Sequence, residues 1–193
     1  MEEGADPVVV DVVAVEEARA LADGVAEAYR ASFGAAPNNE GRAEFDHQRR
    51  AYARMLGQPG FRLAVARRGG GLVGFAYGVF LAPGSRWWEG MVTPLPAGFV
   101  CETGARTFAL IDMGVVPGWR GRGVGRRLHD AVLGGCGAER ATLAVEPRLR
   151  RNQRLYRLWG WRRVGRLTGS AGDIADAYDI YVMDLPVEPT GSP

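Results

Sequence analysis

The stretch Val115-Val116-Pro117-Gly118-Trp119-Arg120-Gly121-Arg122-Gly123-Val124-Gly125-Arg126-Arg127-Leu128 runs from a β-branched segment through a glycine-rich turn into an amphipathic helix. Glycine has no Cβ, so the backbone at Gly121, Gly123 and Gly125 can approach a ligand closely. The helix that follows presents unpaired N–H groups and a partial positive charge at this end. The stretch therefore predicts a binding site for the phosphate groups of a ligand.

The basic residues around this turn exclude one class of phosphate site. Arg120, Arg122, Arg126 and Arg127 add fixed positive charge to the predicted site. All 24 basic residues of the chain are arginine. A Walker loop needs a Lys followed by Ser or Thr, so it is excluded, and lysine Schiff-base chemistry is excluded with it.

Two other interpretations of the turn are weaker. Glu146 follows it by about 20 residues, roughly where a dinucleotide fold places the acid that meets a ribose. The glycines at 121, 123 and 125 are spaced G-x-G-x-G rather than G-x-G-x-x-G, however, and they lie past the middle of the chain. A plain glycine-rich loop with a solvated basic face needs fewer arginines than are present.

Composition indicates one globular domain. The chain has 193 residues, a mass of 20.8 kDa and 47% hydrophobic residues, which is enough for one sizeable core. We expect a single domain over residues 1–186 and a disordered tail over 187–193. A formal net charge of +2 is close to balanced, so the composition gives no sign of a nucleic-acid-binding protein.

Few residues could bind a metal. Cys101 and Cys136 are the only cysteines, and His47 and His129 are far apart in the sequence, so we predict no metal site and no disulfide framework.

The first residues lack the pattern of a secretory signal, and no apolar run approaches the ~20 residues that span a bilayer. These features predict a cytoplasmic protein that does not insert into a membrane.

Hydrophobic periodicity predicts an alternation of strands and helices. Apart from the helix after the phosphate turn, we expect helices over residues 16–33, 41–56 and 152–159. A long loop with three prolines is expected over 82–104. The predicted strands cover residues 7–13, 61–68, 72–81, 106–116, 140–146, 161–167 and 178–185.

The phosphate turn resembles the acyl-CoA motif of the GCN5-related N-acetyltransferase (GNAT) superfamily, V-x-P-x-x-[RQ]-x-x-G-x-G or Ala, and residues 115–125 violate no position of it. The order of the predicted elements is also similar to that of the family. The resemblance implies an α/β (α+β) fold with a mixed, mostly antiparallel sheet flanked by helices. It also implies that two parallel strands, ending near Val115 and Val145, splay apart in a V to admit acetyl-CoA, the acyl donor.

The resemblance assigns the donor site residue by residue. The backbone of Met113, Gly114 and Val115 would pair with the pantetheine arm and polarise the thioester carbonyl. The family commonly has an Asn at the position of Leu149, which is missing here. Asn152 is expected either to reach the pantetheine instead or to cap its helix. The pyrophosphate would lie on Arg120, Gly121, Arg122, Gly123, Val124, Gly125 and Arg126.

The resemblance also suggests a general acid. Residues 155–161, Leu-Tyr-Arg-Leu-Trp-Gly-Trp, resemble the family motif L-Y-x-x-x-G-[FW], which makes Tyr156 the candidate. A phenol with a pKa of about 10 can protonate a thiolate and stay neutral at pH 7. An ordinary tyrosine on an amphipathic helix is the alternative.

The base and the acceptor site are less specified. Asp112 interrupts an apolar strand and Glu102 precedes the same strand, so both are candidate bases, and a salt bridge to an arginine is the alternative for each. Trp87 and Trp88 could either line an acceptor pocket or cover the core. By resemblance, the turn that begins at Phe33 also shapes the acceptor site.

These features predict an N-acetyltransferase in which a primary amine attacks the thioester of acetyl-CoA directly. A small-molecule amine is the first expectation, and a protein N-terminus or lysine is the second. A non-catalytic acyl-CoA-binding module is a further alternative. The alternating residues 178–185 suit an exposed strand edge, so a homodimer is possible.

Overall fold

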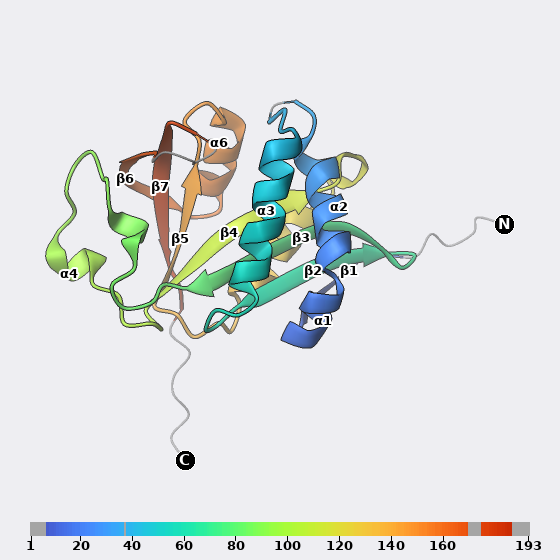
Figure 1. Ribbon diagram of the computed structural model, residues 1–193, viewed down its shortest axis with the longest axis horizontal. Helices are drawn as coiled ribbons and strands as arrows, with labels where there is room; N and C mark the ends of the chain where they lie inside the picture. The colour runs from blue at the N-terminus through green and yellow to red at the C-terminus, as the bar shows by residue number, and fades with distance from the viewer. Residues whose placement is uncertain (1–6, 37, 170–174, 187–193) are drawn as a thin grey trace, which may run out of the picture. The chain divides into compact units, whose positions relative to one another are not determined.

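The computed structural model describes residues 7–36, 38–169 and 175–186 (Figure 1). The predicted tail over 187–193 lies outside the described residues. In chain order the elements are β1 Val9–Val13, α1 Val15–Ala20, α2 Ala22–Phe33, α3 Arg42–Met55, β2 Arg62–Arg68, β3 Gly71–Phe80, η1 Arg86–Trp88, α4 Ala97–Val100, β4 Thr107–Val115, η2 Pro117–Trp119, α5 Val124–Leu133, β5 Arg140–Val145, α6 Arg150–Leu158, β6 Arg162–Thr168 and β7 Ala177–Asp184.

The strands form a seven-stranded sheet in the order β1-β2-β3-β4-β5-β7-β6. The β1–β2, β2–β3, β5–β7 and β6–β7 pairs are antiparallel, whereas β4 and β5 are parallel. This confirms the mixed, mostly antiparallel sheet. The parallel ladder joins Thr107–Ala109 to Arg140–Thr142.

Residue contacts divide the chain into two compact units. Unit 1 comprises residues 1–78 and 112–134, and unit 2 comprises residues 79–111 and 135–193. The chain passes from one to the other within β3, within β4 and just after α5. Each unit has its own buried side chains.

In unit 1, helices cover both faces of the strands. On one face, the ring of Tyr29 from α2 lies 6.2 Å from that of Phe75, and the ring of Tyr52 from α3 lies 5.1 Å from that of Tyr77. On the other face, α5 packs on β1 and β2 and buries Leu128 completely. The guanidinium of Arg62 on β2 donates to the carbonyls of Val132 and Gly134 at 3.0 and 2.8 Å, which places a cation at the negative end of α5.

In unit 2, the long connection between β3 and β4 covers one face of the strands. Trp88 from η1 is buried there with Ala109, Ile180 and Val182. An amide group ties α6 to β7, because Gln153 donates from Nε2 to Asp179 Oδ2 at 3.3 Å. The unit 2 core is therefore closed by residues of irregular backbone as well as by regular elements.

The strand expected at an exposed edge, residues 178–185, is an inner strand, because β7 pairs with both β5 and β6. Three predicted element boundaries also need correction. The helix expected over 16–33 is two helices, because Leu21, at φ −85° and ψ 3°, leaves the helical conformation. The helix expected from residue 152 begins at Arg150, so Asn152 lies inside α6 and does not cap it. The loop expected over 82–104 contains η1 and α4, each too short to show a periodic pattern.

Candidate active site

The glycine-rich turn in unit 1 leaves the start of α5 open. Gly121 and Gly123 have φ values of 73° and 77°, in the left-handed region that side chains disfavour. Gly123 is the N-cap residue of α5, and no side chain caps this helix. A Cβ at either position would find no other atom within 4 Å. The space beside both glycines is therefore open and no side chain caps the start of α5, as a phosphate cradle requires.

The arginines around the turn have structural partners as well as charge. Arg120 donates to the carbonyls of Val115 and Ser32 at 2.9 and 2.6 Å, and so links the end of β4 to α2. The guanidinium of Arg122 lies 5.1 Å from the ring centroid of Trp119. Arg126 pairs with Asp130 one turn along α5, at 2.7 Å. These contacts hold the loop and leave positive charge around it.

β4 enters the turn through Asp112, Met113, Gly114 and Val115. A Cβ on Gly114 would lie 2.9 Å from Ser32 Oγ and from Phe75, so only glycine fits between the strand and α2. The N–H of Val116 donates to the carbonyl of Val73 on β3 at 3.0 Å. Hydrogen bonding to β3 therefore continues to the last residues before the turn.

Asp112 lies in a mostly apolar part of unit 1. The Tyr77 hydroxyl donates to Asp112 Oδ2 in a short hydrogen bond, and Gln48 donates from Nε2 to the Tyr77 oxygen at 3.5 Å. Burial raises the pKa of Asp112 to about 6, and the hydrogen bond from Tyr77 opposes this shift. No arginine pairs with Asp112 among the described residues. The carboxyl group is thus poised to exchange a proton near neutral pH.

A second carboxylate lies near this group. The Tyr29 hydroxyl donates to Glu40 Oε2 at 2.6 Å. Burial raises the pKa of Tyr29, and the charges of Asp112 and Glu40 raise it further. Both carboxylates are therefore within electrostatic reach of one phenol, which gives this part of unit 1 a negative character.

Tyr77 and Gln48 were not predicted from the sequence as site residues. Tyr77 sits in an apolar strand, where nothing in the sequence separates it from a core residue. Gln48 is a polar residue between Phe45 and Tyr52 on the inner face of α3, and its position there is the only signal that the sequence offers.

Glu102 lies in unit 2, in a buried ion pair. Its Oε1 accepts hydrogen bonds from Trp88, Thr107 and Arg140, each at 2.9 Å. The side chains of Glu102 and Arg140 are 1% and 6% exposed. Glu102 therefore forms the salt bridge to an arginine that the sequence suggested as the alternative to a role as general base.

Tyr156 lies on α6 in unit 2 and is partly exposed. Its ring meets those of Trp159 and Trp161 edge-on, at centroid distances of 5.9 and 6.0 Å. Asn152 is also partly exposed, one helical turn before Tyr156. Packing against two tryptophans holds the phenol in place while part of it stays accessible.

The aromatic candidates for the acceptor site differ in exposure. Trp88 is 7% exposed and belongs to the unit 2 core. Of the two roles expected from the sequence, an acceptor pocket or cover for the core, Trp88 has the second. Trp87 is partly buried and donates from Nε1 to Thr142 Oγ1 at 3.1 Å. Phe33, the last residue of α2, is partly buried and lies 4.5 Å from the Tyr29 ring.

Comparison of the sequence with protein-family models matches residues 22–161 to the acetyltransferase (GNAT) family. The matched region contains the phosphate turn, Asp112 and Tyr156. A search of curated proteins found no match. None of the helices in the described ranges has the length and apolar character needed to cross a membrane.

Solved structures of acetyltransferases share this fold. A histone acetyltransferase HPA2-related acetyltransferase from Corynebacterium glutamicum is 18% identical, with a TM-score of 0.62 over 95% of this chain and 99% of its own. The ribosomal-protein-S18-alanine N-acetyltransferase from Escherichia coli is 12% identical, with a TM-score of 0.62 over 96% and 97%.

A third similar structure was solved with a bound acyl donor. The phosphinothricin acetyltransferase from Sinorhizobium meliloti, in complex with AcCoA, is 14% identical to this chain. Its TM-score is 0.57 over 96% of this chain and 92% of its own. At these identities the likeness concerns the fold, whereas the family model matches the sequence itself over more than half of the chain. The chain therefore belongs to the acetyltransferase (GNAT) family.

Proposed function

We propose that the protein transfers the acetyl group of acetyl-CoA to a primary amine of a small molecule, with Asp112 as general base and Tyr156 as general acid. The observation that carries the proposal is the combination, within unit 1, of an open phosphate cradle and a carboxyl group with a pKa of about 6 on the strand leading into it. Asp112 is preferred to Glu102 because all three partners of Glu102 hold it in a buried structural network.

The residues of the turn fit the donor. The N–H groups at the start of α5 and the charge of Arg122 would hold its pyrophosphate, and the backbone of residues 113–115 would pair with its pantetheine arm. When bound, acetyl-CoA supplies an activated acyl group. The open space above Gly121 and Gly123 is what a diphosphate needs to approach the backbone.

Asp112 meets the requirements of the base. With a pKa of about 6, its carboxylate is ionised at neutral pH and can take a proton from an acceptor ammonium group. Tyr77 fixes the orientation of the carboxylate by donating to Oδ2. The carboxylate of Glu40 adds negative charge that attracts a cationic amine.

Tyr156 meets the requirements of the acid. A phenol can return a proton to a thiolate of similar basicity. The two tryptophans that pack against its ring limit its rotation. The hydroxyl group is therefore held within a narrow range of positions, which favours proton transfer.

The test is acetyl-CoA-dependent product formation, read by mass spectrometry over a panel of aminoglycosides, polyamines, amino acids, arylamines and peptides. We expect a gain of one acetyl group on a small amine. Acetylation confined to peptides would move the acceptor to a protein N-terminus or lysine. Binding of acetyl-CoA without any product across the panel would favour the non-catalytic module.

Two variants assign the roles. Tyr156→Phe should lower kcat by about a hundredfold and leave the affinity for acetyl-CoA near that of the wild type, because general-acid catalysis contributes about that much. Asp112→Asn should lower kcat by a similar factor. An unchanged rate in either variant would remove that residue from the mechanism.

A further inference from the structure

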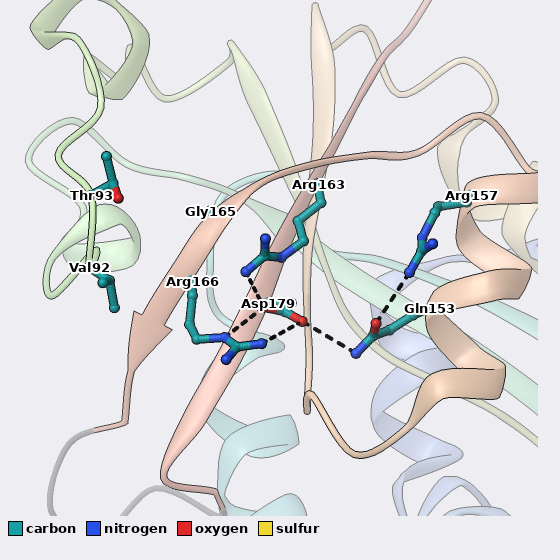
Figure 2. Close-up of a pocket in the computed structure, with 8 residues that line it drawn as sticks. All are labelled: Val92, Thr93, Gln153, Arg157, Arg163, Gly165, Arg166 and Asp179. Carbon is teal, nitrogen blue, oxygen red and sulfur yellow. Dashed lines mark hydrogen bonds and ion pairs between the residues drawn. The ribbon is translucent and has the colours of Figure 1, made fainter.

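A pocket of about 520 Å³ lies in unit 2, between the connection that follows η1, α6 and the strands β6 and β7 (Figure 2). A volume of this size suits a small metabolite. The lining residues are Val92, Thr93, Gln153, Arg157, Arg163, Gly165, Arg166 and Asp179.

Positive charge dominates this pocket. The lining includes three guanidinium groups but a single carboxylate, that of Asp179, whose side chain is only 5% exposed. Arg163 and Arg166 both bind this carboxylate, at 2.7 and 2.9 Å, yet their side chains remain 45% and 44% exposed. Asp179 therefore positions both guanidinium groups while neutralising only one charge. Each guanidinium has five N–H donors, so donors remain for a ligand.

Arg157 is the third guanidinium, and its partner is neutral. It donates to Gln153 Oε1 at 3.4 Å, as Figure 2 shows. Gln153 is itself fixed, because it donates to Asp179 and to the carbonyl of Pro147 at 3.0 Å. Within the part of the chain that the structure describes, Arg157 has no carboxylate within 4.0 Å. Its charge is thus available to an anion.

The remaining wall of the pocket is uncharged. Val92, Thr93 and Gly165 contribute an apolar side chain, a hydroxyl group and bare backbone. Charge at one side and a neutral surface at the other suit a ligand with an acidic group attached to a larger body. A guanidinium pair of this kind matches the geometry of a carboxylate or a phosphate.

α6 connects this pocket to the proposed chemistry. Gln153 and Arg157, both on α6, line the pocket. Tyr156, the proposed acid, lies three residues after Gln153 and directly before Arg157. Residues three apart lie on the same side of a helix. The pocket therefore begins within one helical turn of the residue that would protonate the leaving thiolate.

We infer that this pocket binds the carboxylate or phosphate group of the acceptor, so that the acceptor is an amine that also carries an acidic group. The inference rests on the proposed function and narrows its substrate class. The acidic end of the acceptor would bind Arg157, Arg163 and Arg166.

Matched acceptor pairs test this substrate class. Each pair contains an amine with an acidic group and the same amine without it: phenylalanine and phenethylamine, tryptophan and tryptamine, and phosphoethanolamine and ethanolamine. We expect kcat/KM to favour the acidic member of at least one pair by about tenfold or more, since hydrogen bonds to charged groups have about that effect. Preference for phosphoethanolamine identifies a phosphate, and preference for an amino acid identifies a carboxylate.

Two arginines on α6 provide the variant and its control. Arg157→Gln should raise KM for the acidic acceptor by about tenfold, leave kcat nearly unchanged and leave the non-acidic partner unaffected. Arg154→Gln removes an exposed charge from the same helix outside the pocket, and should change neither. Equal kcat/KM for both members of every pair in the wild type, or equal effects of the two variants, would overturn the inference.

A binding measurement separates failure of the pocket from failure of the proposed function. Inorganic phosphate should raise the thermal midpoint of the wild type and of Arg154→Gln more than that of Arg157→Gln. Only Arg157→Gln lacks one of the guanidinium groups that line the pocket. An equal rise in all three proteins would overturn the inference, because phosphate would then be bound elsewhere. If the three proteins show the same rise in thermal midpoint but still transfer acetyl groups, only the proposed role of the pocket is disproved. If the difference between the variants is present but no amine is acetylated, only the proposed function is disproved.

Discussion

At the scale of single residues, the proposed chemistry depends on the pKa of Asp112. Burial raises this pKa to about 6, and the Tyr77 hydrogen bond limits the rise. We expect kcat/KM for the acceptor to fall as the pH drops through about 6, because the carboxylate becomes protonated and can no longer accept a proton. A pH profile of kcat/KM from pH 5 to pH 8 measures this limb.

Tyr77→Phe is the matching variant, because it keeps the ring that packs against Tyr52 and removes the hydroxyl. It should move the acidic limb to higher pH, since the bond that lowers the pKa of Asp112 is lost. Asp112→Asn should abolish the limb. A limb that persists unchanged in Asp112→Asn would show that another group titrates.

The same shift has a consequence for stability. Because the folded-state pKa of Asp112 is above its ordinary value of 3.8, the native state binds this proton more tightly than the unfolded chain does. The resulting stabilisation is fully present below pH 3.8 and is lost as the pH rises through about 6. Asp112→Asn should therefore be relatively more stable than the wild type at pH 8 than at pH 4, as denaturant unfolding at the two pH values would show.

Alanine substitutions at Gly123 and Gly118 form a matched test of the phosphate cradle. Ala at position 123 would adopt a φ of 77°, at a cost of roughly 1 kcal/mol, and would place a methyl group in the open space above the cradle. We expect Gly123→Ala to weaken acetyl-CoA binding by about tenfold or more in a calorimetric titration. Gly118 also has open space around it but no left-handed φ, so Gly118→Ala should bind nearly as the wild type. Equal affinities for the two variants would contradict the cradle.

At the scale of elements, the sequence predicted those with strong periodicity and missed those held only by tertiary contacts. The β2–β3 hairpin, the buried face of α2 with Val25, Tyr29 and Ser32, and the mixed sheet are confirmed. η1 and α4 span only three and four residues, so no repeat marks them. Their positions depend on Trp88 and Phe99, which pack edge-on at 5.5 Å.

Site residues were predictable to the extent that a motif contains them. The phosphate turn is a local pattern, whereas the contact between Tyr77 and Asp112 joins residues 35 positions apart through strand register. The arginine-lined pocket likewise combines the connection after η1 with α6, β6 and β7, so no single stretch of sequence indicates it. Spacing along the chain does not report such long-range neighbours.

The segment before β4 is held to β5 by the Glu102–Arg140 pair, and this predicts a structural role for Glu102. Glu102→Gln would leave the buried Arg140 without its counter-charge, at a cost of about 3 kcal/mol, or a fall in Tm of roughly 6–12 °C for a chain of this size. The folded variant should keep kcat within about twofold of the wild type. A normal Tm with a collapsed kcat would instead make Glu102 the base. Differential scanning calorimetry and a rate assay on the same sample decide between them.

At the scale of the whole molecule, the two compact units share two strands. Residues 71–78 of β3 belong to unit 1 and residues 79–80 to unit 2, while β4 changes unit between Ile111 and Asp112. A strand cannot easily unfold at one end while the other keeps its full pairing, so the units should unfold together. We therefore expect one cooperative thermal transition, as for a single domain over residues 1–186.

Acetyl-CoA should shift this whole transition. A ligand present at about 100 times its Kd stabilises the native state by about 2.7 kcal/mol, which corresponds to a rise in Tm of roughly 5–10 °C for a chain of this length. If unfolding is cooperative, the rise appears both in tryptophan fluorescence, to which unit 2 contributes four of the five tryptophans, and in the far-ultraviolet circular dichroism, although the phosphate cradle lies in unit 1. Two separate transitions, with only one of them moved by acetyl-CoA, would show instead that the units fold independently. NAD at the same concentration should leave Tm unchanged, because the glycine spacing of the turn is not that of a dinucleotide fold.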